Sequence, residues 1–296
     1  MKRFYTPIRN FVFGRVINPI TYKFFTKRLH ILNSIDSIEY IIEHKCSISR
    51  YGDGEFFVMM GKGNGFQSPN RKLAESLIKV LVTDEPNHRC GIPLPLKDLS
   101  NLKEYPYFFW NFFTGRNYWV LKKYLSNDKL YLNTQLSRFY MDYVDKSNCK
   151  KQFELLKSIW QDRDIVIVEG NESRSGIGND LFDNAKSIQR ILGPAKNAFD
   201  QYDEMLQAIK DHVSKDRLIL LSYGMTATVL AYDLAKLGYW AVDLGHLDLE
   251  YEWYLHGAEE KQVVSGKFTN EVQGGNQVAV CTDPTYLSQI IVDITK

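Results

Sequence analysis

The sequence lacks the features of disulfide-rich, zinc-binding and membrane-spanning proteins. Its four cysteines, Cys46, Cys90, Cys149 and Cys281, are scattered, and there is no Cys-x-x-Cys motif or Cys/His cluster. This argues against a disulfide framework and a zinc site, and it predicts reduced thiols in a cytoplasmic protein. No apolar run is long enough to cross a bilayer, and no signal peptide is visible. The net charge of +2 argues against a general nucleic-acid-binding protein.

Residues 1–30 differ in composition from the rest of the chain. They carry seven lysines and arginines and no acid, interleaved with aromatic residues. Such a stretch can lie on an anionic membrane, here the inner face of the cell membrane, or form a helical arm that packs on the domain or on a partner subunit. No linker rich in Pro, Gly or Ser follows, so we predict an arm over 1–30 and one domain over 31–296.

The second half of the chain shows a regular alternation of strands and helices. Apolar runs at 164–168, 218–221 and 240–244 are each followed by a polar turn. This pattern predicts an α/β, Rossmann-like, mostly parallel sheet flanked by helices. We expect further strands near 47–50, 90–93 and 130–134. We expect helices at 31–45, 71–83, 104–125, 139–159 and 226–237, with one more from Asn179 or Asp180 through Ile188 and Ile191.

The first strand ends in a glycine-flanked acidic turn, Arg50-Tyr-Gly52-Asp53-Gly-Glu55. In an extended or turning backbone, Asp53 and Glu55 point to one side, and two close carboxylates attract a cation. Mg²⁺ or Mn²⁺ is the usual ion when the partner is a phosphate. An ordinary surface turn is the alternative, because Asp-Gly is a common turn sequence.

Polar residues after the later strands are candidate ligands of a nucleotide. The loop 169–180 combines glycines with an arginine and resembles a phosphate cradle, although it is not a Walker A loop. Asn179 or Asp180 could instead be a simple helix cap. The candidates for nucleotide-sugar binding are Arg50, Gly52, Asn171, Ser173, Arg174, Gly178, Asn179, Asp180, Tyr223 and Thr226.

The segment 243–253 concentrates acids around a histidine. His246, Asp248 and Glu250 face one way if the segment is extended, whereas His246 and Glu250 are neighbours if it is helical. Either arrangement can supply a metal ligand or a general base. A helix start decorated with acids is the alternative.

Four segments together resemble a known family. They are 49–56, 171–182, Gly193-Pro-Ala-Lys-Asn-Ala-Phe199 and 243–253. In this order they resemble the GT-D type glycosyltransferases, formerly a domain of unknown function, first described in streptococcal adhesin glycosylation. The resemblance covers roughly residues 32–265. Tyr51 stands where phenylalanine is more common, and the basic arm lies outside the resemblance.

The resemblance implies a Rossmann-like enzyme that uses a UDP-sugar and a divalent metal bound by an Asp-x-Glu motif, here Asp53-Gly-Glu55. We therefore expect transfer of a hexose from UDP-glucose or UDP-galactose to a glycan, glycolipid or glycoprotein in bacterial surface polysaccharide or glycoprotein synthesis. His246, Asp248 and Glu250 are the candidate bases if the reaction inverts configuration. A non-catalytic nucleotide-sugar-binding protein and a Rossmann methyltransferase are the alternatives, and a homo-oligomer is compatible with the sequence.

Overall fold

The computed structural model describes residues 11–269 and 271–295, and these form one nine-stranded sheet. The strand order is β1-β4-β3-β2-β8-β7-β5-β6-β9, and each neighbouring pair is parallel. The strands are β1 (His30–Ile31), β2 (Ser47–Arg50), β3 (His88–Ile92), β4 (Leu130–Asn133), β5 (Asp164–Gly170), β6 (Ser187–Gly193), β7 (Leu218–Ser222), β8 (Trp240–Asp243) and β9 (Ile290–Asp293). The prediction of a parallel α/β sheet is confirmed.

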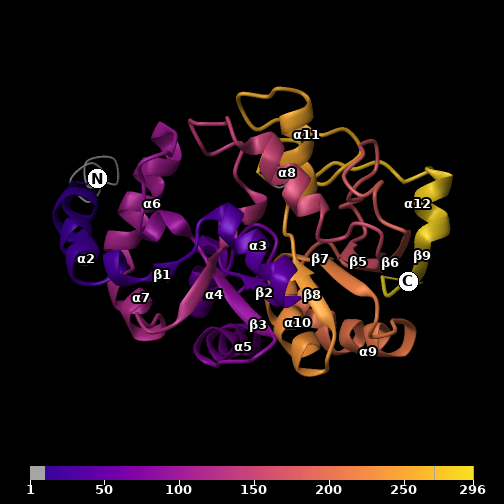
Figure 1. The fold of residues 1–296 in the computed structure, drawn as a ribbon, viewed down its shortest axis with the longest axis horizontal. Helices are drawn as coiled ribbons and strands as arrows, with labels where there is room; N and C mark the ends of the chain where they lie inside the picture. Colours follow the sequence, from indigo (N-terminus) through magenta and orange to yellow (C-terminus); the bar gives the residue numbers. More distant parts are fainter. Residues whose placement is uncertain (1–10, 270, 296) are drawn as a thin grey trace.

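Helices cover both faces of the sheet (Figure 1). They are α2 (Asn18–Phe24), α3 (Ser34–His44), α4 (Asp53–Met59), α5 (Arg71–Val82), α6 (Glu104–Arg116), α7 (Tyr118–Tyr124), α8 (Cys149–Lys157), α9 (Tyr202–His212), α10 (Gly224–Lys236), α11 (Leu247–Leu255) and α12 (Pro284–Gln289). A π-helix, η1 (Val12–Ile17), precedes α2. Between α11 and α12, the described residues of the 256–283 segment form no helix or strand.

The central strand β5 is buried on both faces because its side chains alternate between two cores. Ile165 and Ile167 of β5 pack with α3, α8 and α11, which lie above the sheet in Figure 1. Val166 and Val168 pack with α9 and α10, which lie below it. The continuous apolar run of β5 is therefore the sequence signature of a strand that is buried on both faces.

Local signals place several helices where the sequence predicts them. Asn33 caps α3 by accepting a 2.9 Å hydrogen bond from the backbone N–H of Asp36. Asn70 caps α5 in the same way, through the N–H of Leu73 at 3.0 Å. Each cap satisfies a backbone donor that the first helical turn leaves unpaired.

Two predicted helices are wrong. Ile188 and Ile191 belong to β6, which pairs in parallel with β5 over seven residues, and turns rather than a helix cover 171–186. Their three-residue spacing fits a helix equally well, and pairing with β5 decides the outcome. The helix expected over 139–159 is present only as α8, because residues 139–148 form turns and bends.

The described part of the N-terminal arm packs against α6. The Asn18 side-chain amide donates a 2.5 Å hydrogen bond to Oδ1 of Asn111, and the ring of Phe13 meets that of Phe112 edge-on at 5.7 Å. Gly115 allows this approach, because an added Cβ would lie 2.1 Å from the carbonyl oxygen of Phe13. The first ten residues of the predicted arm lie outside the described residues. Of the residues described, none belongs to a helix long and apolar enough to cross a membrane.

All four cysteines are free thiols. Burial raises the pKa of Cys46 and of Cys90 to about 12 and that of Cys149 to about 11. Cys281, in the 256–283 segment, is only partly buried.

Candidate functional site

The carboxyl ends of four neighbouring strands bring most of the sequence-predicted segments to one edge of the sheet. β2, β8, β7 and β5 are adjacent in that order and run parallel. Asp53 follows β2, Asp243 ends β8, Tyr223 follows β7 and Asn171 follows β5. Ligands of open parallel sheets bind at this edge, where the strand order changes direction.

The acidic pair occupies the first turn of α4 rather than an extended turn. Gly52 precedes the helix, and its N–H donates a 2.7 Å hydrogen bond to Oε2 of Glu55, which is the glutamate half of a capping box. Gly54 lies between the two acids, where an added Cβ would come within 2.7 Å of Cε of Met225. The glycine therefore lets the acidic turn lie directly against the first turn of α10.

Three carboxyl groups share this part of the edge. Burial, reinforced by the charges of Asp243 and Asp53, raises the pKa of Glu55 to about 7. Burial raises the pKa of Asp243 to about 6, opposed by Arg50, and it also raises the pKa of Asp53. A cation bound at this cluster would favour the ionised forms of all three.

The acidic pair fits a hard divalent ion in part. Nowhere in the described ranges do three His, Cys, Asp or Glu side chains group to hold a metal. However, Mg²⁺ characteristically takes one or two carboxylates and completes its shell with substrate phosphates and water. Within residues 11–269 and 271–295, Asp53 makes no hydrogen bond or ion pair with another side chain. The expected alignment of the two carboxylates does not hold, because positions i and i+2 of a helix do not face each other, and Oε2 of Glu55 already accepts the N–H of Gly52. A metal-ligand role for Asp53 and Glu55 stays a prediction.

Arg50 is fixed beside the acids. Its Nε donates a 2.8 Å hydrogen bond to the carbonyl of Thr134, and its Nη1 lies 3.7 Å from Oδ1 of Asp243. Gly245, at φ +52°, makes room for the guanidinium, because an added Cβ would lie 1.9 Å from Nη1. Arg50 thus orients Asp243, and a contact of Arg50 with a nucleotide stays a prediction.

A narrow pocket lies between the ends of β5 and β7 and the start of α10. It is lined by Phe66, Gln67, Gly170, Ser173, Pro194, Ala195, Ala198, Ser222, Tyr223, Gly224, Met225, Thr226, His246 and Phe268. Its volume is about 40 Å³, so a nucleotide can enter only if the lining side chains move apart. Four sequence-predicted residues meet here: Ser173, Tyr223, Thr226 and His246.

Two hydroxyl groups of this pocket's residues have no partner. Oγ1 of Thr226 and the phenol oxygen of Tyr223 are buried without a hydrogen bond to any described residue. Leaving a buried polar group unpaired costs about 1–3 kcal/mol, so a ligand that accepts a hydrogen bond would recover this energy. Thr226 lies in the first turn of α10, where backbone N–H groups and the helix dipole favour an anion.

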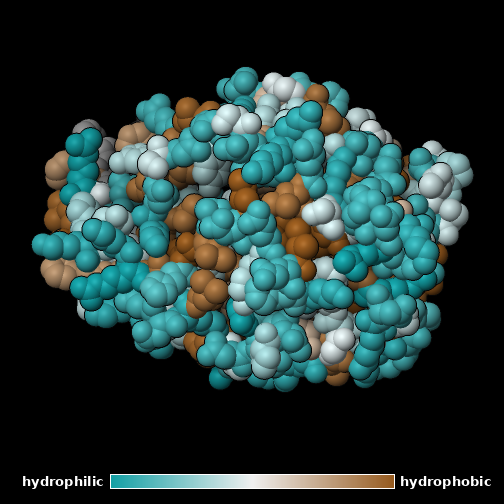
Figure 2. Space-filling model, viewed as in Figure 1, coloured by the Kyte–Doolittle hydropathy of each residue, from teal (hydrophilic) through white to brown (hydrophobic). Residues whose placement is uncertain are grey.

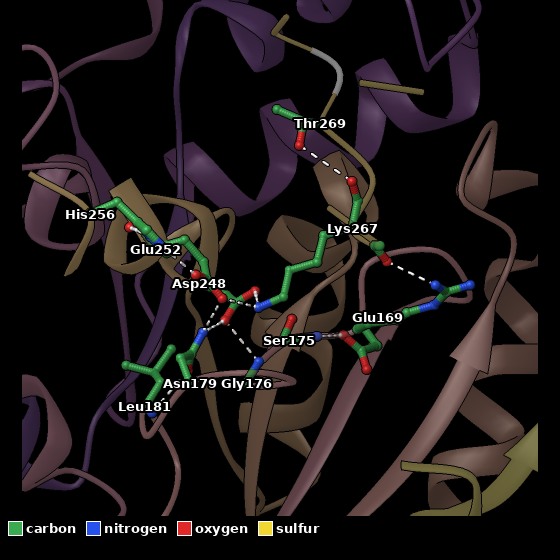
Figure 3. Close-up of polar contacts among 12 residues, drawn as sticks. Glu169, Ser175, Gly176, Asn179, Leu181, Asp248, Glu252, His256, Lys267 and Thr269 are labelled. Carbon is green, nitrogen blue, oxygen red and sulfur yellow. Dashed lines mark hydrogen bonds and ion pairs between the residues drawn. The ribbon is translucent and has the colours of Figure 1, made fainter. Parts of the chain in front are cut away.

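Asp248 and Asn179 lie outside the pocket and hold the 256–283 segment in place (Figure 3). Asp248 accepts hydrogen bonds from the N–H of Gly176 at 2.8 Å and from Nζ of Lys267 at 2.6 Å. Asn179 donates to Asp248 at 2.8 Å and to Glu252 at 2.7 Å, and Lys267 also reaches Glu252 at 2.8 Å. This buried network ties the loop after β5 to α11 and to Lys267, the residue before Phe268.

The other predicted residues of the two loops have partners of their own. Arg174 donates to the carbonyls of Gly266, at 2.8 Å, and Ala279, so its guanidinium also anchors the 256–283 segment. Asp180 pairs with Lys157 at 2.7 Å, and hydrogen bonds from Lys157 and Tyr251 lower its pKa.

Glu250 is 1% exposed and accepts the N–H groups of Tyr140 and Met141, at 2.7 and 2.8 Å, while burial raises its pKa. The backbone N–H of Asn171 donates to Gly193, and Gly178 has φ +81°. Ligand or catalytic roles for Arg174, Asp180 and Glu250 stay predictions.

The expected phosphate cradle differs from the structure in one respect. No helix follows the loop 171–186, and the helices that begin at this edge are α4 after β2, α10 after β7 and α11 after β8. Asn179 does accept the N–H of Leu181 at 3.0 Å, but in a turn. Sequence reasoning also missed Phe66, Phe268 and Lys267, which come from loops without a periodic pattern.

The comparisons with known proteins agree with this geometry. A model of the GT-D glycosyltransferase fold matches residues 48–272. Glycosyltransferase GlyD of Streptococcus pneumoniae serotype 4 is 40% identical over 261 residues, which are 88% of this chain and 32% of that protein. The probable glycosyl transferase Gly of Streptococcus gordonii is 37% identical over 273 residues, 91% of this chain and 39% of that protein. The chain thus spans only about a third to two fifths of these curated relatives.

Solved structures are similar over nearly their whole length. One, described as the highly conserved domain of unknown function 1792 with a distinct glycosyltransferase fold, superimposes with a TM-score of 0.88 at 36% identity, covering 93% of this chain and 99% of that chain. A glycosyltransferase of the same domain type from Streptococcus sanguinis superimposes with a TM-score of 0.85 at 35% identity, covering 90% of this chain and 99% of that chain.

Proposed function

The chain belongs to the GT-D glycosyltransferases, and we propose that it transfers a hexose from a UDP-sugar with the help of Mn²⁺ or Mg²⁺. UDP-glucose and UDP-galactose are the proposed donors. The proposed acceptor is a glycan, glycolipid or glycoprotein of a bacterial cell surface. The names of the relatives support glycosyl transfer, and the donor, the metal and the acceptor are our proposals.

One observation carries the proposal. A carboxylate pair and an anion-binding helix start lie in contact at the carboxyl edge, because Gly54 packs on Met225. The first turn of α10 and the unpaired hydroxyl of Thr226 suit a phosphate, while Asp53 and Glu55 suit the cation that accompanies a diphosphate. A nucleotide diphosphate is the ligand that uses both features.

The chemistry follows from charge. When the glycosidic bond of the donor breaks, negative charge develops on the leaving diphosphate, and a bound divalent ion would neutralise part of it. In this proposal, the N–H groups at the start of α10 and the Thr226 hydroxyl would stabilise the same charge through hydrogen bonds.

An inverting reaction also needs a base for the acceptor proton. Of the three candidates, His246 is the one that lines the pocket, whereas Asp248 and Glu250 are held by Lys267 and by backbone N–H groups. His246 precedes α11, and its Nδ1 lies 3.3 Å from Oε1 of Glu271, which can orient the ring. We therefore assign the base role to His246 if the reaction inverts.

The test combines binding with turnover. We expect UDP with Mn²⁺ to raise the melting temperature and S-adenosylmethionine to leave it unchanged. We also expect Asp53→Asn and Glu55→Gln to remove the Mn²⁺-dependent shift and hydrolysis across a panel of UDP-sugars. Glu75→Gln, which changes an exposed carboxylate of α5, is the matched control. Full hydrolysis in EDTA, or a Mn²⁺ response retained in both variants, would refute the metal role.

A further inference from the structure

The N-terminal helical segment exposes a stripe of large apolar side chains. Val12, Val16, Ile20 and Phe24 are spaced four residues apart along η1 and α2, and their exposed fractions are 38, 47, 55 and 59%. Residues at this spacing lie one above another on a helix, so the four share one side of the segment.

The opposite side of the same segment is already packed. Asn18 and Thr21 are buried, and α2 and η1 lie against α6. The segment is therefore apolar on its outer side as well as packed on its inner side. The outer stripe is exposed among polar residues in the described parts of this chain, and an exposed apolar surface of this kind commonly marks an interaction site.

The neighbouring helices expose further large aromatic side chains. Tyr105 and Phe108 of α6 are 79 and 53% exposed, and Trp119 of α7 is 76% exposed. Figure 2 shows apolar side chains among polar ones at the end of the molecule where Figure 1 places α2 and α6. Between α2 and α6 a groove of about 890 Å³, lined by Phe11, Tyr22 and other aromatic residues, adds apolar area to this surface.

The same surface is strongly basic. Residues 11–28 carry four exposed cations and no acid, and residues 104–124 carry three exposed cations and one acid, whereas the whole chain has a net charge of only +2. The cations are Arg15, Lys23, Lys27, Arg28, Arg116, Lys122 and Lys123. We call the exposed side chains of 11–28 and 104–124 the aromatic-basic surface.

We propose that the aromatic-basic surface binds the face of an anionic lipid bilayer. Exposed aromatic rings with lysines and arginines around them match the headgroup layer, where rings reach the acyl boundary and cations contact lipid phosphates. Lysine is depleted in protein–protein interfaces, yet four of the seven cations here are lysines. This composition favours a lipid surface over a protein partner, and it positions the enzyme for an acceptor carried at a membrane.

The experiment measures co-sedimentation of the full chain with vesicles. Vesicles of phosphatidylcholine alone are compared with vesicles that also contain phosphatidylglycerol, at low and high salt. We expect binding to the anionic vesicles that weakens with salt, because surface charges are screened. Lys122→Gln and Lys123→Gln should each lower the partition coefficient about fivefold. Lys151→Gln and Lys210→Gln, which neutralise exposed lysines elsewhere, should leave it unchanged.

The apolar stripe is tested in the same assay. We expect Ile20→Ser with Phe24→Ser to abolish sedimentation with anionic vesicles, while Val144→Ser with Val280→Ser, which are exposed elsewhere, keep it. Brominated lipids should quench the fluorescence of Trp119, the most exposed of the tryptophans, and Trp119→Phe should lose this quenching.

Two outcomes overturn the proposal. One is that the Ile20→Ser, Phe24→Ser variant sediments with anionic vesicles as much as the unchanged protein does, or that the unchanged protein sediments with neither kind of vesicle. The other is a dimer in light scattering that the stripe variant converts to a monomer, which would assign the surface to a second copy of the chain.

Discussion

Replacing Thr226 by valine tests the anion site in two directions at once. Valine has nearly the same shape but lacks the hydroxyl that is buried without a partner. Removing an unpaired buried hydroxyl relieves a cost of about 1–3 kcal/mol, so we expect Thr226→Val to stabilise the free protein by about 1 kcal/mol. For a chain of 296 residues, that raises the melting temperature by about 1–2 °C.

The same change should weaken donor binding. A hydrogen bond to a charged group contributes about 1.5–3 kcal/mol, so losing one to a phosphate should raise the dissociation constant for UDP with Mn²⁺ about tenfold or more. Stability is measured by urea denaturation of the free protein, and affinity by titration calorimetry. The expected combination, a more stable protein that binds UDP less well, is what separates a ligand-binding hydroxyl from a structural one.

Thr228 on the same helix provides the matched control. It is also fully buried, but its hydroxyl donates a 3.0 Å hydrogen bond to the carbonyl of Arg50. Thr228→Val should therefore lower the free energy of unfolding by about 1 kcal/mol, because a satisfied bond is lost. If Thr226→Val destabilises the protein as Thr228→Val does, or leaves the affinity for UDP unchanged, the assignment of a phosphate to the start of α10 is wrong.

Three further variants test the framework of the site. Lys267→Met leaves two buried carboxylates without their cation and should cost about 3–5 kcal/mol in urea denaturation, whereas a cost below that of an ordinary surface change would contradict the buried network. Burial lowers the pKa of His88 from 6.5 to about 3. Below pH 6.5 the unfolded chain takes up a proton that the folded protein refuses, so the free energy of unfolding should fall by about 1.4 kcal/mol per pH unit down to pH 3. His88→Gln should lose less stability in acid, and an unchanged pH profile would count against this. Gly245→Ala should destabilise more than Gly257→Ala, since both have positive φ but an added Cβ meets Arg50 only at Gly245, and equal melting temperatures would remove the steric argument.

Six of the nine described strands could be predicted from sequence, and β1, β6 and β9 could not. The apolar runs of β5, β7 and β8 need no knowledge of their neighbours, since strands buried on both faces are continuously apolar. Ile188 and Ile191 carry no such signal, because a spacing of three fits a helix and only pairing with β5 shows that they form β6. The order of strands in the sheet depends on contacts between distant residues, which local periodicity does not contain.

The residues of the candidate site also fall into those that the sequence predicts and those that it does not. Asp53, Glu55, Thr226 and His246 follow strands directly, so the sheet topology brings them to one edge. Phe268 reaches the pocket only because Lys267 and contacts of Arg174 fix the 256–283 segment across it. Lys267 and Asp248 are 19 positions apart, and Arg174 and Gly266 are 92 apart. No local sequence pattern in an irregular segment predicts contacts at such separations.

The four thiols differ in their accessibility. Cys46, Cys90 and Cys149 are buried, whereas Cys281 is partly accessible and lies two residues from Ala279, whose carbonyl accepts a hydrogen bond from Arg174. A maleimide dye applied to the native enzyme would therefore attach at this one position without any engineered cysteine. A change in its emission when UDP and Mn²⁺ are added would show whether the segment that carries Phe268 moves on donor binding.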